Sequence, residues 1–160
     1  MPGMKIQLLL IGKTDKAYIE EGINEYLGRL RHYADTEIII APVKKQWSKL
    51  PVQERKEKEA EVILKHIMQS DRCILLDEKG KSLNSGGFAN LLGQIMSGPY
   101  KKLLFVVGGP WGFSPEVYRK AHMKLSLSAM TFSHQVIRII FLEQLYRAMT
   151  IIRGEPYHNQ

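Results

Sequence analysis

Residues 103–116, Leu-Leu-Phe-Val-Val-Gly-Gly-Pro-Trp-Gly-Phe-Ser-Pro-Glu, pass from an apolar run through a glycine- and proline-rich turn to the start of a helix. Five consecutive apolar residues indicate a strand buried on both faces, as in a parallel sheet. The turn contains Gly108, Gly109 and Gly112, where the backbone can approach a ligand closely. Open α/β sheets bind ligands at the carboxyl ends of their strands, so we expect a ligand site here.

The same turn also has a purely structural interpretation, because any connection between a strand and a helix uses glycine or proline. The spacing of Gly108-Gly109-Pro110-Trp111-Gly112 matches neither G-x-G-x-x-G nor G-x-x-x-x-G-K-[ST]. The turn therefore supports neither a dinucleotide site nor a P-loop.

The rest of the chain alternates strand-like and helix-like segments, which predicts one α/β domain over residues 1–160 with a mainly parallel sheet and helices on both faces. We expect strands at 5–11, 36–43, 72–77, 103–107 and 125–127. We expect helices at 16–31, 53–68, 88–96, 116–122 and 134–153, with a polar turn at 78–85. The last helix is apolar around much of its circumference, and a second subunit is one natural cover for it. Arg138 in that helix is expected to bind phosphate or to support the dimer.

Composition indicates a globular domain in the cytoplasm. Hydrophobic residues make up 44% of the chain, no apolar run approaches the ~20 residues of a membrane span, and the N-terminus lacks a secretory pattern. The five histidines show no ligand spacing and there is one cysteine, so we expect no metal.

Positive charge is concentrated at the C-terminal end. Residues 101–160 carry 8 Lys and Arg against 3 Asp and Glu, which is +5 of the total net charge of +7. Aromatic residues are interleaved with these cations, and this combination suits an RNA partner, although many basic proteins bind no nucleic acid.

Three segments in order identify a family. They are Val107-Gly108-Gly109-Pro110-x-Gly112-Phe113-Ser114, the run from Leu125 to Gln135 (Leu-Ser-Leu-Ser-Ala-Met-Thr-Phe-Ser-His-Gln), and Glu143-Gln144-Leu145-Tyr146-Arg147-Ala148 followed by Pro156-Tyr157-His158. With these motifs the chain resembles the bacterial ribosomal RNA large subunit methyltransferase H family, of the SPOUT class. The resemblance implies a homodimer and a C-terminal trefoil knot, with the knotted cofactor-binding part at about 72–160. Chain-topology rules alone would have given an unknotted sheet.

The resemblance also implies an activity. Members of the family transfer a methyl group from S-adenosylmethionine to N3 of a pseudouridine in the helix 69 stem-loop of 23S ribosomal RNA, in assembled ribosomes. Carried over by position, the cofactor pocket would use Leu76, Gly108 and the loop made of Leu127, Ser128, Ala129, Met130, Thr131 and Phe132.

Arg147, Tyr157 and His158 are the residues expected on the RNA side of the reaction. A cation stabilises a deprotonated base, so Arg147 is the first candidate, with a surface ion pair or an RNA-phosphate contact as its alternative. Tyr157 could stack on the target base, and His158 has an accessible imidazole beside it. Two other functions remain open: a non-catalytic RNA- or ribosome-binding protein on a degenerate knot, and a nucleotide-binding module of flavodoxin-like topology.

Overall fold

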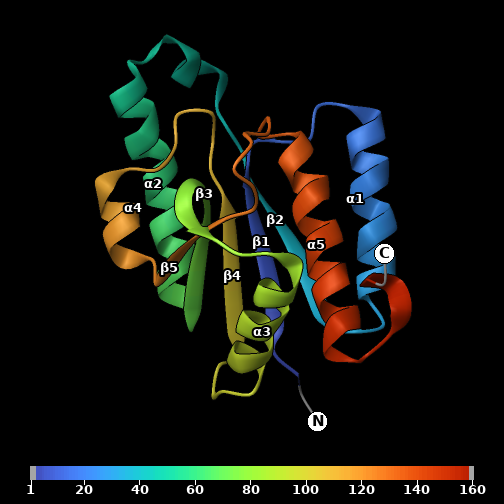
Figure 1. Ribbon diagram of the computed structural model, residues 1–160. Coiled ribbons are helices and arrows are strands. Elements are labelled where there is room, and N and C mark those ends of the chain that lie inside the picture. The colour runs from blue at the N-terminus through green and yellow to red at the C-terminus, as the bar shows by residue number, and fades with distance from the viewer. Residues whose placement is uncertain (1–2, 159–160) are drawn as a thin grey trace.

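The computed structural model describes residues 3–158 and is built on a sheet of five strands in the order β2-β1-β4-β3-β5 (Figure 1). Every neighbouring pair is parallel, so the carboxyl ends of the strands gather at one edge. The order differs from the 2-1-3-4-5 of flavodoxin-like sheets, which removes that alternative. The strands are β1 (Lys5–Ile11), β2 (Asp35–Ala41), β3 (Arg72–Ser82), β4 (Lys102–Val107) and β5 (Met123–Ser126).

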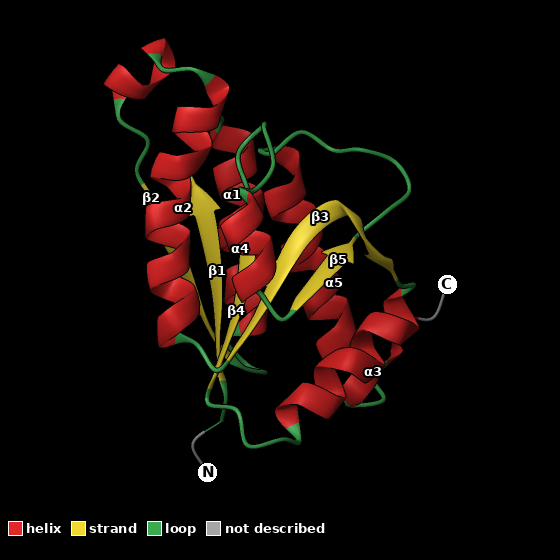
Figure 2. Ribbon diagram, turned by 90° about the vertical axis from the view of Figure 1, so that its left-hand side faces the viewer, coloured by secondary structure: helices red, strands yellow, loops and turns green. Residues whose placement is uncertain are grey.

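Helices cover both faces of the sheet, as the sequence predicts (Figures 1 and 2). Residues from α1, α3 and α5 share one hydrophobic cluster with the sheet, and residues from α2 and α4 share the other. The bounds are α1 (Ala17–Leu30), α2 (Val52–Gln69), α3 (Ser85–Met96), α4 (Pro115–Lys120) and α5 (Val136–Ile152), with short 3-10 helices η1 (Lys45–Lys49) and η2 (Pro156–His158).

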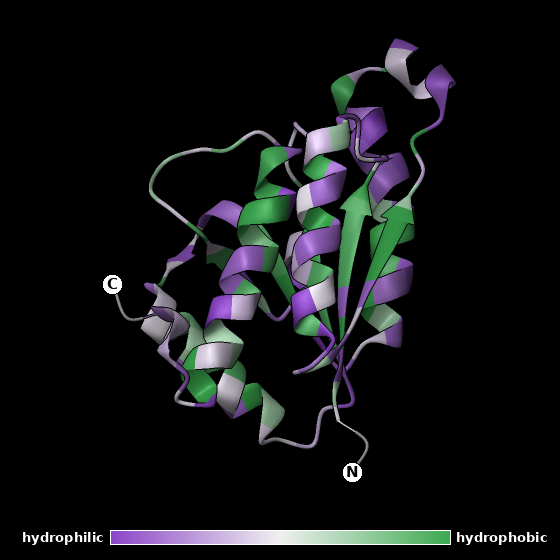
Figure 3. Ribbon diagram, turned by 90° about the vertical axis from the view of Figure 1, so that its right-hand side faces the viewer, coloured by the Kyte–Doolittle hydropathy of each residue, from purple (hydrophilic) through white to green (hydrophobic). Residues whose placement is uncertain are grey.

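Burial on both faces explains the unbroken apolar run of β4. Phe105 and Val107 belong to the cluster with α1, α3 and α5, whereas Leu104 and Val106 belong to the cluster with α2 and α4. Figure 3 shows the same apolar character along the strands of the sheet. A strand in this position has no solvent-facing side, and therefore no alternating pattern.

The expected polar turn at 78–85 was wrong over its first part, because β3 continues through it to Ser82. After pairing with β5 up to Leu76, the strand breaks register and pairs again through Lys81 and Ser82. Figure 2 shows this extension curving over β5. Gly80 makes the approach possible, since a Cβ there would lie 2.6 Å from the backbone nitrogen of Leu125. Exposed polar residues gave no periodicity from which this extension could be predicted.

The apolar surface of α5 is covered largely within the chain. The helix packs against α1 and α3, and Phe141, Leu142 and Leu145 are fully buried between them and the sheet. Exposed apolar surface remains at Val136 and Ile152 near its ends. The dimer expected from this helix stays a prediction.

Arg138 is fully buried, and the expectation that it binds phosphate or supports a dimer was wrong. Its guanidinium donates hydrogen bonds to the carbonyl of Ile11 at 2.9 Å, to Thr14 Oγ1 at 3.0 Å and to the carbonyl of His134 at 3.2 Å. These bonds join the end of β1 to the start of α5. No helix among residues 3–158 is long and apolar enough to span a membrane.

Replacing Arg138 with Met should destabilise the fold by about 3 kcal/mol, because the Ile11 carbonyl and the Thr14 hydroxyl lose a charged donor inside the protein. Urea denaturation monitored by circular dichroism measures this loss. Arg153→Met is the matched control, since Arg153 is exposed, and should cost less than about 1 kcal/mol. Equal stability of the two variants would contradict the structural role assigned to Arg138.

Candidate functional site

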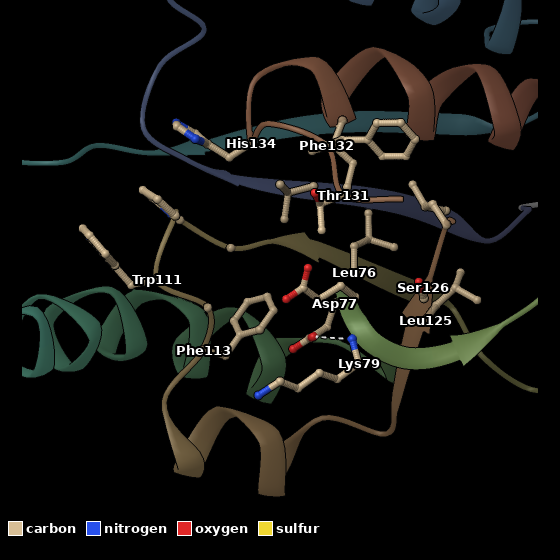
Figure 4. Close-up of a pocket in the computed structure, with 18 of the residues that line it drawn as sticks. Leu76, Asp77, Lys79, Trp111, Phe113, Leu125, Ser126, Thr131, Phe132 and His134 are labelled. Atoms are coloured by element: carbon tan, nitrogen blue, oxygen red, sulfur yellow. Dashed lines mark hydrogen bonds between the residues drawn. The ribbon is translucent and has the colours of Figure 1, made fainter. Parts of the chain in front are cut away.

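A pocket of about 500 Å³ lies at the carboxyl edge of the sheet. Three strand-end segments form most of its wall: residues 76–79 in β3, residues 107–113 after β4, and residues 125–132 at and after β5. Figure 4 shows these segments converging, with Leu76 and Asp77 between the Thr131 side and the Phe113 side. The strand ends thus meet where the sequence predicts a ligand site.

The pocket brings together most of the residues predicted to bind the cofactor. Ala129 is the exception: it is exposed and does not line the pocket. The residues that do line it are Leu76, Gly108, Leu127, Ser128, Met130, Thr131 and Phe132.

Hydroxyl groups shape the loop after β5. Ser126 Oγ donates to the carbonyl of Ser128 at 2.9 Å, and Ser128 Oγ accepts from the backbone nitrogen of Met130 at 3.0 Å. The Met130 side chain is 76% exposed although it lines the pocket. A flexible thioether in this position can cover the apolar face of a bound molecule.

Gly108 is required by the packing of a neighbouring side chain. A Cβ at this position would lie 2.9 Å from Cζ of Phe113, whose ring is buried. Gly112 has φ +77, a backbone conformation that favours glycine. The glycine turn therefore lets the Phe113 ring pack beneath the start of the turn, and the pocket wall depends on that packing.

Asp77 and Tyr118 form a polar edge that the sequence analysis missed. The Tyr118 hydroxyl donates to Asp77 Oδ2, and the backbone nitrogen of Lys79 donates to Oδ1 at 2.9 Å. Burial, together with this hydrogen bond, raises the pKa of Tyr118 to about 12, so the phenol remains a donor. The Asp77 carboxylate is thereby held at the pocket, where it can accept hydrogen bonds from ribose hydroxyls. The available signal was a carboxylate directly after the buried stretch 73–76 of β3.

Arg147, Tyr157 and His158 lie together, as expected, but outside this pocket. Arg147 Nη2 is 2.7 Å from Glu143 Oε1, and Nη1 is 3.3 Å from His158 Nδ1. The guanidinium carbon lies 4.8 Å from the centre of the Tyr157 ring. The hydrogen bond to Glu143 raises the pKa of Arg147, so the group stays a cation.

This cluster is separated from the pocket along α5. Ile137 lines the pocket, and Arg147 follows ten residues later, which is about 15 Å of helix. Figure 1 shows the C-terminal segment at the far end of α5 from the loop that precedes the helix. Within one chain, Arg147 does not face the cofactor pocket.

Within residues 3–158, no group of three or more His, Cys, Asp and Glu side chains is placed to hold a metal ion. The pocket offers backbone groups, hydroxyls, one carboxylate and apolar side chains instead. These are the groups that bind a nucleoside-like organic cofactor.

A parallel sheet with such a pocket at its strand ends defines a cofactor-binding α/β protein. Residues 4–158 match the family described as Predicted SPOUT methyltransferase. The chain is 53% identical over 157 residues to Ribosomal RNA large subunit methyltransferase H of Parabacteroides distasonis, covering 98% of this chain and 100% of that protein. It is 48% identical to the protein of the same name from Christiangramia forsetii, with the same coverage.

The chain therefore belongs to the ribosomal RNA large subunit methyltransferase H family of SPOUT methyltransferases. S-adenosylmethionine is the methyl donor of this class, and the pocket described above fits it. A probable methylase family protein from Haemophilus influenzae Rd KW20 shares the fold alone, with a TM-score of 0.53 and 11% identity over 93% of this chain and 66% of that one. The trefoil knot stays a prediction from the family.

Gly108→Ala should weaken binding of S-adenosylhomocysteine at least tenfold, because the new methyl group displaces the Phe113 ring from beneath the turn. Isothermal titration calorimetry on the folded variant measures the change. Gly93→Ala is the control: its Cβ would meet no atom closer than 4.0 Å, so cofactor affinity should stay unchanged. Parental affinity in Gly108→Ala would show that the turn tolerates a side chain and is not tightly packed.

Proposed function

We propose that this protein transfers the methyl group of S-adenosylmethionine to N3 of a pseudouridine in the helix 69 stem-loop of large-subunit ribosomal RNA, within assembled ribosomes. The observation that carries the proposal is the full-length 53% identity to a protein named Ribosomal RNA large subunit methyltransferase H. The choice of pseudouridine N3 comes from the family resemblance of the motifs around Gly108, Leu127 and Arg147. A ribosomal substrate would place the protein in the cytoplasm.

The reaction makes a bond from N3 to the methyl carbon, breaks the bond from that carbon to sulfur, and releases the N3 proton. Bound S-adenosylmethionine supplies an electrophilic methyl group. The loop at 127–132 and the turn at 108–112 line the pocket and would hold the donor in place, which leaves alignment of the base as the main remaining requirement. A cation near the base would stabilise the negative charge that develops when N3 loses its proton.

Arg147 fits that role only if it reaches the cofactor pocket of a second subunit. Within its own subunit, it lies about 15 Å along α5 from Ile137, which lines the cofactor pocket. Its neighbour His158 is exposed and Tyr157 is half-buried, so a partner molecule can reach this cluster. A symmetric dimer would therefore build each active site from the cofactor pocket of one chain and the Arg147 cluster of the other. The basic character of residues 101–160 supports RNA contact on this surface.

Ribosomes from a strain that lacks this methyltransferase provide the direct test. Incubation with the purified protein and labelled S-adenosylmethionine should place one methyl group per large subunit, at N3 of a helix 69 pseudouridine, as mapped by mass spectrometry. Tight ribosome binding without methyl transfer would favour the non-catalytic alternative instead.

Changing Arg147 to Ala, or removing residues 157–160, should lower methyl transfer to ribosomes roughly 100-fold and leave cofactor affinity within a few-fold. Single-turnover assays with saturating ribosomes measure the rate, and calorimetry measures the affinity. Arg153 is an exposed cation at the end of the same helix, and Arg153→Ala should retain the parental rate.

The shared site predicts subunit complementation. Sedimentation should report twice the 18.4 kDa chain mass. Mixing the impaired Gly108→Ala and Arg147→Ala proteins, at a cofactor concentration too low to saturate Gly108→Ala, should raise the activity above that of either protein alone, because each mixed dimer contains one site free of both substitutions. An active monomer, or no recovery after proven subunit exchange, would overturn the shared site.

A further inference from the structure

A second cavity, of about 610 Å³, adjoins the cofactor pocket. It opens at the ends of β1 and β2 and is closed on the far side by η1 and α2. Four residues line both cavities: Gly109, Pro110, Trp111 and His134. In Figure 4, Trp111 and His134 lie on the side of the cofactor pocket opposite Leu125 and Ser126. The second cavity is therefore next to the place where the methyl donor is held.

Glu59 lines this second cavity with an unpaired carboxylate. Its side chain is only 9% exposed, yet it makes no hydrogen bond or ion pair with another residue in the described part of the chain. Its oxygens come within 3.0 and 3.1 Å of the position of a Cβ on Gly109. Among described residues, Thr36 Oγ1 is the only fully enclosed side-chain polar atom without a partner, so the Glu59 oxygens keep access to the cavity.

Arg55, one turn earlier on α2, makes no ion pair with Glu59. Its guanidinium donates instead to the carbonyls of Ser48 at 2.6 Å and Leu50 at 3.0 Å, which fixes the segment that carries Trp47. Burial raises the pKa of the Glu59 carboxyl, although the positive charges of Arg55 and Lys56 act to lower it. Because no group among residues 3–158 donates to it, the Glu59 carboxylate is free to accept a hydrogen bond from a molecule that enters the cavity.

The remaining walls suit a nucleotide. Trp47 and Trp111, the two tryptophans of the chain, both line the cavity and offer faces on which a base can stack. Lys13, Lys44 and Lys45 also line it and are exposed, so they can reach backbone phosphates. The tryptophans can therefore stack on a base, the Glu59 carboxylate can accept a hydrogen bond from an N–H group of that base, and the lysines can bind the phosphates.

We propose that this cavity holds the target base of the RNA and that Glu59 accepts a hydrogen bond from N1–H of pseudouridine. The inference rests on the proposed function. Pseudouridine has two ring N–H groups, N1–H and N3–H, whereas N1 of uridine is bonded to the ribose. Because N3 must face the methyl donor in the adjoining pocket, N1–H is the ring donor left for Glu59. The carboxylate then selects pseudouridine over uridine.

Trp47 fluorescence tests this directly in the Trp111→Phe protein, where it is the only tryptophan. With S-adenosylhomocysteine saturating the first pocket, a helix 69 stem-loop carrying pseudouridine should quench Trp47. The same RNA with uridine at the target position should bind roughly 10- to 100-fold more weakly, the range expected for losing a hydrogen bond to a charged group. An abasic target position should give no quenching, because phosphate contacts alone place no base in the cavity.

Glu59→Met, close in volume but without an acceptor, should remove the preference for pseudouridine, and Glu59→Gln, which keeps a carbonyl oxygen, should be intermediate. Both should remain folded, since they delete an unpaired buried charge. Glu61→Met on the exposed side of α2 is the matched control and should keep the full preference.

Three results would overturn the inference. The first is quenching of Trp47 that does not depend on the base at the target position, and the second is an undiminished preference for pseudouridine in Glu59→Met. The third is a change in Trp47 fluorescence, in the absence of RNA, when residues 157–160 are deleted. That result would mean that the C-terminal tail of the partner subunit occupies the cavity. Methylation of ribosomes by the wild-type protein is measured separately. Failure of that assay with Trp47 quenching intact would reject the proposed function and keep the base pocket.

Discussion

Both cavities depend on the hydrogen bonds that the buried guanidinium of Arg138 donates. The guanidinium binds the carbonyl at the end of β1 and the carbonyl of His134, two points far apart in the sequence. The loop after β5 ends at this anchor, and that loop forms one wall of the cofactor pocket. Burial of a cation is costly, and here two carbonyls and the hydroxyl of Thr14 offset the cost. Because these partners come from both ends of the chain, the site cannot assemble before the fold is complete.

The two halves of the proposed reaction use different kinds of groups. The cofactor pocket relies on backbone turns and hydroxyls, with Gly108 and Ser128 as examples, whose positions are set by the sheet. The Arg147 cluster is made of long side chains held by one another, since Glu143, Tyr157 and His158 all contact the guanidinium. In the proposed reaction the methyl donor would be held by backbone turns, whereas the RNA would meet side chains that can exchange partners when a phosphate or a base arrives.

Sequence patterns predicted the strands and the helices on both faces, because local periodicity carries that information. The residues proposed for the cofactor came from the family resemblance, and most of them line one pocket. Sequence patterns failed where tertiary context decides. In the sequence, Arg138 cannot be distinguished from an arginine on the protein surface. Only the structure shows that its side chain is buried. Glu59 was hidden in a charge-rich helix that was interpreted as solvated, although one carboxylate of that helix faces inward. The strand order and the extension of β3 follow from pairings between distant segments, which no local pattern encodes.

The strand order also has a consequence for how the chain is made. β1 lies between β2 and β4, and its second neighbour, β4, ends only at Val107 of 160 residues. During synthesis, the apolar β1 therefore leaves the ribosome long before the strand that covers its other edge. Contacts of such large sequence separation form slowly and leave apolar edges exposed meanwhile. A protein proposed to modify ribosomes thus keeps one edge of β1 unpaired while it is itself being translated, until the residues of β4 have left the exit tunnel.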